Sequence, residues 1–205
     1  MQVCCNKRVF QATRRWLFGA LLVLTAGLAT VPVAQAHPHA RFSYQLDPVL
    51  RDGAVVGLTV RWMLDPLTSL LALRGIDANR NGIADPEELA AFARLNDQLV
   101  STQGYFLSLG AGTDTRPGFR VSRGLSAEQS AQRIQLSFEV TLEQPHRGPL
   151  TVRLFDASWY VALSADDPPL PAGHACQGSA ALETLETQGW GAQPVPVVRL
   201  TCPGT

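Results

Sequence analysis

The sequence predicts a mainly β (α+β) fold, an antiparallel β-sandwich into which a helix–loop–helix hairpin is inserted. Several segments alternate apolar and polar residues or are rich in β-branched and aromatic residues, which is typical of strands buried on one side. One region, at about residues 66–100, has the apolar spacing of helices instead. The order of strands, helical hairpin and more strands favours a sandwich with an insert.

The predicted strands, in chain order, are Arg41–Leu46, Val55–Leu64, Tyr105–Leu109, Arg133–Leu142, Leu150–Phe155, Trp159–Leu163 and Val195–Leu200. The clearest is the fourth, in which every second residue from Ile134 to Leu142 is apolar and the residues between them are polar. This period of two places the apolar side chains on one face of a sheet.

Two helices and a loop-rich tail complete the predicted layout. Pro66–Arg74 and Pro86–Val100 are the predicted helices, and the second of them carries its apolar residues roughly on one face. The stretch 165–196 contains five prolines, which predicts a loop-rich C-terminal tail.

The beginning of the chain has the three parts of a secretory signal peptide. Paired arginines precede the apolar run Trp16–Val33, and Ala34-Gln35-Ala36 closes it. The alternative is an uncleaved membrane anchor, because the run is about long enough to cross a bilayer. We expect residues 1–36 to be a cleaved signal peptide and residues 37–205 to form a single exported, periplasmic domain. No later apolar run is long enough to span a membrane.

Charge and cysteine content fit an exported domain. The whole chain carries 17 basic and 17 acidic residues, but residues 37–205 carry 13 basic and 17 acidic ones, a net charge of −4. The lack of a basic cluster argues against nucleic-acid binding. After residue 36 the cysteines are Cys176 and Cys202, which we expect to form a disulfide in an oxidising compartment. The alternative is a thiolate metal site that also uses His174.

The residues between the two predicted helices match a calcium-binding EF-hand loop. Glycine occupies loop position 6, at Gly82, and the carbonyl of Ile83 at position 7 is the expected backbone ligand. Side-chain oxygens at positions 1, 3, 5, 9 and 12 come from Asp77, Asn79, Asn81, Asp85 and Glu88. The spacing predicts a Ca²⁺ site. Alternatively, Asp85-Pro86-Glu87-Glu88 is only the capping box of a helix.

Cleavage after Ala36 creates a second candidate metal site. The mature chain then starts at His37, whose α-amine and imidazole can chelate one ion, and His39 can add a further nitrogen. Nitrogen ligands suit transition metals such as Ni²⁺, Co²⁺, Zn²⁺ or Cu²⁺. The alternative is that both histidines are simply solvated at a frayed terminus.

Four motifs in order carry a family resemblance: His37-Pro38-His39-Ala40, Arg61–Asp65, Asp77–Leu89 and Phe155–Ala162. With them the chain, from about His37 to Leu163, resembles the exported bacterial family called domain of unknown function 1007. The resemblance implies a periplasmic component of uncharacterised transport systems, near nickel/cobalt-type metal transporters. It also implies that Asp65 and Asp156 are candidate ligand carboxylates, although an aspartate after a strand often caps a turn. Ala84 departs from the larger apolar residue usual in the family.

These features leave three functions open. The first is a periplasmic metal-binding or accessory protein whose partner is an inner-membrane transition-metal transporter. The second is a calcium-stabilised envelope interaction module that handles no transition metal. The third is a histidine-brace-type copper enzyme. No nucleophile elbow, Ser-His-Asp arrangement, phosphate loop or zinc-protease motif is legible, so we predict no catalytic residues and no enzyme activity.

Overall fold

The computed structural model describes residues 38–111, 116–187 and 191–203. All of them belong to one compact unit, His37–Thr205. The predicted signal peptide of residues 1–36, and His37 with it, lie outside the described residues.

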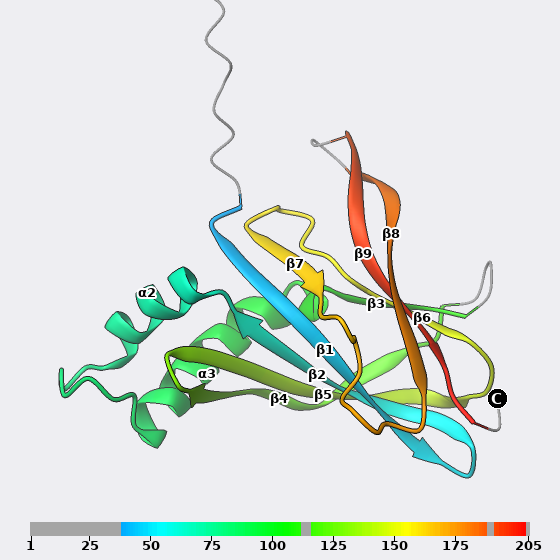
Figure 1. Cartoon of the computed structure of the whole chain (residues 1–205), viewed down its shortest axis with the longest axis horizontal. Helices are drawn as coiled ribbons and strands as arrows, with labels where there is room; N and C mark the ends of the chain where they lie inside the picture. Colours follow the sequence, from blue (N-terminus) through cyan, green and yellow to red (C-terminus); the bar gives the residue numbers. More distant parts are fainter. Residues whose placement is uncertain (1–37, 112–115, 188–190, 204–205) are drawn as a thin grey trace, which may run out of the picture. The chain divides into compact units, whose positions relative to one another are not determined.

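Within the described residues the strands form two sheets (Figure 1). The five-stranded sheet has the order β4-β5-β2-β1-β7, and the four-stranded sheet has the order β3-β6-β9-β8. Neighbouring strands are antiparallel except β1 and β7, which pair in parallel. The strands are β1 (Ala40–Arg51), β2 (Ala54–Leu64), β3 (Leu107–Gly110), β4 (Phe119–Ser130), β5 (Arg133–His146), β6 (Leu150–Leu154), β7 (Val161–Ala165), β8 (Gln177–Thr187) and β9 (Gly191–Thr201).

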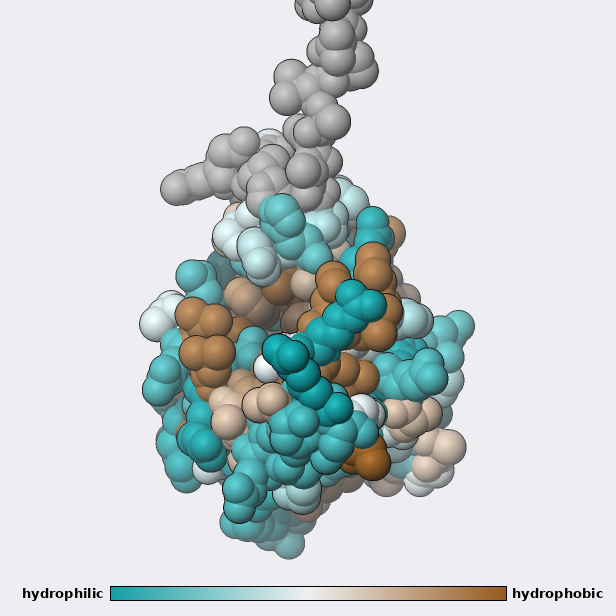
Figure 2. Space-filling view, turned by 90° about the vertical axis from the view of Figure 1, so that its left-hand side faces the viewer, coloured by the Kyte–Doolittle hydropathy of each residue, from teal (hydrophilic) through white to brown (hydrophobic). Residues whose placement is uncertain are grey.

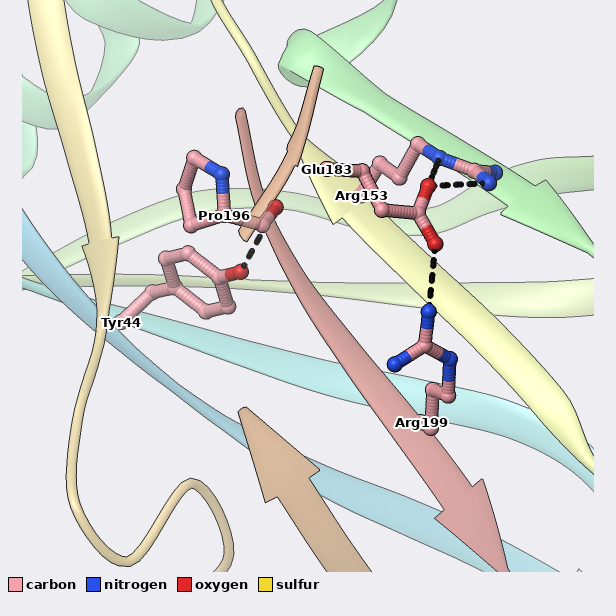
Figure 3. Close-up of polar contacts among 5 residues, drawn as sticks. All are labelled: Tyr44, Arg153, Glu183, Pro196 and Arg199. Carbon is pink, nitrogen blue, oxygen red and sulfur yellow. Dashed lines mark hydrogen bonds and ion pairs between the residues drawn. The ribbon is translucent and has the colours of Figure 1, made fainter. Parts of the chain in front are cut away.

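The alternation read from the sequence produces the core. Buried residues alternate with partly exposed ones along β2 and β5, and Trp62 packs edge-on against Phe138 with 5.0 Å between the ring centroids. A hydrogen bond joins the two sheets: the Tyr44 hydroxyl of β1 donates to the Pro196 carbonyl of β9 at 3.4 Å (Figure 3). Burial raises the pKa of Tyr44, so this phenol stays protonated and can donate. The predicted mainly β sandwich with a helical insert is confirmed.

The helical insert consists of α2 (Pro66–Ile76) and α3 (Pro86–Ser101), each slightly longer than predicted. The helix α2 lies beside β5 and α3 beside β4, so the hairpin covers one end of the five-stranded sheet (Figure 1). The buried Ser69 hydroxyl of α2 donates to the Leu64 carbonyl and accepts the N–H of Ile134, which ties the helix to two strands. A short 3-10 helix, Gly104–Phe106, connects α3 to β3. None of the helices in the described ranges is both long and apolar enough to cross a bilayer.

The predicted loop-rich tail is wrong from residue 177 onward, because Gln177–Thr187 and Gly191–Thr201 are the paired strands β8 and β9, whereas residues 166–176 do form a loop. The prolines of β9 are tolerated because of their position. On its other side β9 pairs with β6 only from Val197 onward, so Pro194 and Pro196 lie outside the stretch in which β6 and β9 are paired. A missing N–H on that side of β9 breaks no ladder hydrogen bond with β6.

The disulfide between Cys176 and Cys202 is confirmed. It joins the residue before β8 to the residue after β9, at the open end of their hairpin. Farther along the same sheet, the Glu183 carboxylate of β8 accepts hydrogen bonds from Arg153 of β6 and Arg199 of β9, at 2.7 and 2.8 Å (Figure 3). The carboxylate thus bridges an arginine of the neighbouring strand and an arginine of the strand beyond it, which stabilises the sheet across its width.

Candidate functional site

The predicted calcium loop connects α2 to α3, and its second half is built as a helix start. Asp85 is the N-cap of α3, where one carboxylate oxygen accepts the N–H groups of Glu87 and Glu88 at 3.0 Å. The Glu88 carboxylate in turn accepts the N–H of Asp85 at 3.1 Å. The capping box that the sequence offered as an alternative is therefore present. A capping box leaves the other oxygen of Asp85 for a further partner, which is the Asn79 amide at 3.5 Å.

The first half of the loop folds its backbone around the predicted ligand side chains. The two oxygens of Asp77 accept the N–H groups of Asn81 and Gly82, at 2.9 and 2.8 Å. The Asn81 side-chain oxygen accepts the N–H of Ile83 at 2.8 Å. From the far end of the loop, Glu88 accepts the N–H of Ala78 at 2.9 Å. The side chains at the first, fifth and twelfth loop positions are thus fixed by N–H groups of the backbone between residues 78 and 83.

Two positive φ angles produce the tight turn of this loop. Arg80, at loop position 4, has a φ of 59°, and Gly82, at position 6, has a φ of 84°. A left-handed residue is costly unless it is glycine, which explains the glycine at position 6. The sequence predicts a sharp bend at Gly82, and the backbone bends sharply there.

The chemistry of the donor set fits a hard cation such as Ca²⁺. All six predicted donors are oxygens, which is the ligand type that calcium prefers. The side-chain oxygens of Asp77, Asn79 and Asn81 each accept one N–H and keep a second lone pair for a cation. One oxygen of Asp85 and one of Glu88 each accept two N–H groups, which leaves their other oxygen for a cation. Across the ranges that the structure describes, no three or more His, Cys, Asp and Glu side chains are grouped as a metal site. The three carboxylates of the loop, Asp77, Asp85 and Glu88, are therefore not gathered as such a group in this structure, and a bound cation would have to draw them together.

A contact that the sequence did not suggest links the loop to the sheet. The N–H of Ala84, at loop position 8, donates to the side-chain oxygen of Gln129 in β4, at 3.2 Å. The Gln129 amide in turn donates to the Ala131 carbonyl at 3.0 Å, in the turn between β4 and β5. Ala84 itself is buried and belongs to the hydrophobic core. No motif flags Gln129, because its role depends on a contact between residues 45 apart in the sequence.

The predicted transition-metal residues lie in two places. His39 and Asp156 both line a cavity of about 520 Å³ between the helical hairpin and the five-stranded sheet. His39 is exposed, its N–H donates to the Tyr160 carbonyl, and the His39 and Tyr160 rings lie 4.9 Å apart. Asp65 is not among the residues that line this cavity. Of the predicted site, His39 and Asp156 thus line the same cavity and Asp65 does not, while His37 is outside the described residues.

Both aspartates already have structural partners. The Asp156 side chain, 2% exposed, accepts the N–H of Ser158 at 2.8 Å and that of Val161 at 2.9 Å, which fixes the turn between β6 and β7. Asp65 is the N-cap of α2 and accepts the N–H groups of Leu67 and Thr68. A metal-ligand role for either carboxylate stays a prediction.

The helical hairpin also exposes apolar side chains. Figure 2, which views the domain from the side of the hairpin, shows brown patches separated by teal ones. The exposed apolar residues of the hairpin are Leu67, Leu70, Leu71, Ile83, Leu95 and Leu99. Between α2 and the β4–β5 turn a groove of about 950 Å³ includes Leu67 and Leu70, together with Asp77, Gly82 and Ala84 of the loop. The candidate calcium loop therefore forms one wall of a largely apolar groove.

Comparison with known proteins gives a family but no activity. No curated protein matches the chain. The profile of the family described as "Protein of unknown function (DUF1007)" matches residues 22–182, which include both helices, the loop between them and the Asp156 turn. The chain therefore belongs to the DUF1007 family.

Proposed function

We propose that this protein is an exported, calcium-stabilised module in which Ca²⁺ fixes the helical hairpin against the sheet. The observation that carries the proposal is the arrangement of Asp77, Asn81 and Glu88, whose side-chain oxygens are held over one tight turn by backbone N–H groups. The expected protein ligands are Asp77, Asn79, Asn81, Asp85, Glu88 and the carbonyl of Ile83. When bound, calcium supplies positive charge that offsets the repulsion among the three carboxylates.

The rest of the geometry supports a binding role for the hairpin. The loop joins two helices that carry exposed leucines, and it also lines the groove next to α2. Exposed apolar side chains that gather into a patch commonly mark interaction surfaces. Fixing the loop fixes the relative position of these leucines. The proposed module therefore presents the apolar side of α2 and α3 to a partner in the envelope.

Calcium titration of paired glutamate variants tests this proposal. Glu88→Gln keeps a capping-box residue, because glutamine serves in that motif, but removes the charge and the bidentate carboxylate. After chelation, we expect calorimetry to give the wild-type protein a Kd of roughly 10⁻⁴–10⁻³ M, and Glu88→Gln to weaken binding on the order of tenfold or more. Glu87→Gln is the matched control and should bind as the wild type does. Absence of heat from the wild type at millimolar Ca²⁺ would contradict the proposal.

A second candidate is transition-metal handling for an inner-membrane transporter, through the amine and imidazole of His37 together with His39. It is favoured by the position of His39, which is exposed at the cavity that Asp156 also lines. The protein, produced with its own leader, should first have its terminus identified by mass spectrometry. Binding of Ni²⁺, Co²⁺, Zn²⁺ or Cu²⁺ should then be lost in His39→Ala and in a protein with one extra residue before His37. Binding that survives both changes would exclude this site.

A further inference from the structure

We infer that Gln129 of β4 is a positioning residue for the candidate calcium loop and that it couples cation binding to the β4–β5 hairpin. The inference rests on the proposed calcium function and adds a residue outside the twelve-residue motif. Its basis is the hydrogen bond from the N–H of Ala84 to Gln129 Oε1, 3.2 Å long.

A single peptide unit links Gln129 to the candidate cation site. The N–H of Ala84 and the carbonyl of Ile83 belong to the same planar trans peptide, so the two groups point in opposite directions. An acceptor that fixes the N–H of Ala84 therefore also fixes the carbonyl of Ile83, directed away from Gln129. That carbonyl is the expected backbone ligand at loop position 7. Gln129 thus sets the orientation of a ligand that it does not touch.

The two bonds of this peptide strengthen each other. A cation that draws electron density from the Ile83 carbonyl makes the N–H of Ala84 a better donor, and a bond to that N–H makes the carbonyl a better ligand. The coupling is reciprocal: if the hydrogen bond to Gln129 strengthens cation binding, then a bound cation strengthens the contact between the loop and β4 by the same free energy.

The surroundings of Gln129 hold it in place. Its amide donates to the Ala131 carbonyl at 3.0 Å, which orients the side chain so that Oε1 faces the loop. On the loop side, Ala84 is 6% exposed and packs in the core, so the position of its N–H is fixed by packing as well. Gln129 also lines the groove of about 950 Å³ with Asp77 and Gly82. Cation binding and the shape of this groove therefore depend on the same contact.

Three variants of the full chain, exported and purified in its disulfide-bonded form, test the inference by calcium calorimetry. Gln129→Met keeps the length of the side chain but removes the acceptor, and we expect its Kd for Ca²⁺ to rise about two- to tenfold, the effect of one hydrogen bond. Gln129→Glu keeps an acceptor for the N–H of Ala84 but loses the donor to the Ala131 carbonyl, and it should bind Ca²⁺ more tightly than Gln129→Met does. Gln132→Met, in the turn after β4, is the matched control and should leave the Kd unchanged.

The outcomes separate the inference from the proposed function. If the wild type binds no Ca²⁺, both are overturned. If the wild type binds and Gln129→Met binds equally well, or Gln129→Glu is as weak as Gln129→Met, only the inference is overturned. A lower melting temperature with an unchanged Kd indicates a merely structural contact and also overturns it. If Gln129→Met does not fold, the amide resonance of Ala84 in the wild type decides: it should shift on addition of Ca²⁺, and a resonance that stays fixed overturns the inference.

Discussion

The hydroxyl of Tyr105 lies 2.6 Å from Oδ1 of Asp97 and donates a hydrogen bond to it, and the same oxygen accepts the N–H of Leu125 at 2.7 Å. One carboxylate of α3 thus holds both the 3-10 helix after α3 and the middle of β4. Gly124 leaves room for it, because a Cβ there would lie 2.7 Å from that oxygen. Asp97 is therefore a polar connection between the far end of the hairpin and the sheet. Burial and the Asp97 carboxylate together raise the pKa of Tyr105 to about 12.

Removing the Tyr105 hydroxyl should loosen this connection. Tyr105→Phe leaves the Asp97 carboxylate without one of its donors, and we expect the free energy of unfolding to fall by about 1.5–3 kcal/mol, the range for hydrogen bonds to charged groups. Urea denaturation measures it. Tyr160→Phe, which removes an exposed phenol, is the control and should change little. Equal stabilities of the two variants would show that the Tyr105–Asp97 bond contributes nothing.

Gly57 should not tolerate a side chain. A Cβ at this position in β2 would lie 2.5 Å from the Val140 carbonyl oxygen of β5, and a backbone atom of a central strand cannot move aside cheaply. We expect Gly57→Ala to lower the free energy of unfolding by about 1–3 kcal/mol. At Gly75, in α2, a Cβ would meet no atom within 4 Å, so Gly75→Ala should stabilise the protein by up to about 1 kcal/mol. A Gly57→Ala protein as stable as the wild type would contradict the close approach of β2 and β5.

The hydrogen bonds to the Asp65 carboxylate should make the stability of the protein depend on pH in acid. Burial alone would raise its pKa, but the Thr68 hydroxyl and the N–H groups of Thr68 and Leu67 donate to the carboxylate and hold its pKa below the usual 3.8. A carboxyl with a lowered pKa in the folded state stabilises the protein above its unfolded pKa, and this contribution is lost as the pH falls through the lowered value.

Two substitutions of Asp65 make this loss measurable. Asp65→Asn keeps an equally good N-cap but does not titrate, so as the pH falls below about 4 its free energy of unfolding should fall less steeply than that of the wild type. Asp65→Ala removes the cap and should cost about 1 kcal/mol at neutral pH. If the free energy of unfolding falls equally steeply with pH in the wild type and in Asp65→Asn, Asp65 does not contribute to the loss of stability in acid.

The disulfide should contribute to stability through the unfolded chain. Cys176 and Cys202 are 26 residues apart, and closing a loop of that size removes entropy equivalent to roughly 3 kcal/mol from the unfolded state. Urea denaturation with and without a reductant should show a difference of this size. A Cys176→Ser, Cys202→Ser double variant is the control, since it should match the reduced wild type and not respond to reductant.

The sequence predicted the parts of the fold whose pattern is local. The alternation in β5 and the two proline-started helices were visible because each element buries one face against a continuous core. The strand β4 was missed because its ladder with β5 has two register shifts, between Val121 and Arg123 and between Arg123 and Ser126, which interrupt the period of two. The strand β8 was missed because much of it is exposed, including Leu182 and Leu185, so the apolar alternation carries little information there.

The candidate site shows the same division. The spacing of Asp77 to Glu88 predicted a tight loop with a bend at Gly82 and a capping box, and both are present. The partners that fix Asp65 and Asp156 are close in the sequence, and the sequence offered turn capping as one role for each. The contact between Ala84 and Gln129 could not be predicted, because it requires knowing that the β4–β5 turn lies beside the loop.

The position of the disulfide has a consequence for limited proteolysis. Since Cys176 and Cys202 flank the β8–β9 hairpin, a single cut between β8 and β9 yields two fragments that stay covalently joined. Mass spectrometry of the nicked protein should give the full mass plus one water without reductant, and only after reduction should a C-terminal fragment of about 15 residues separate.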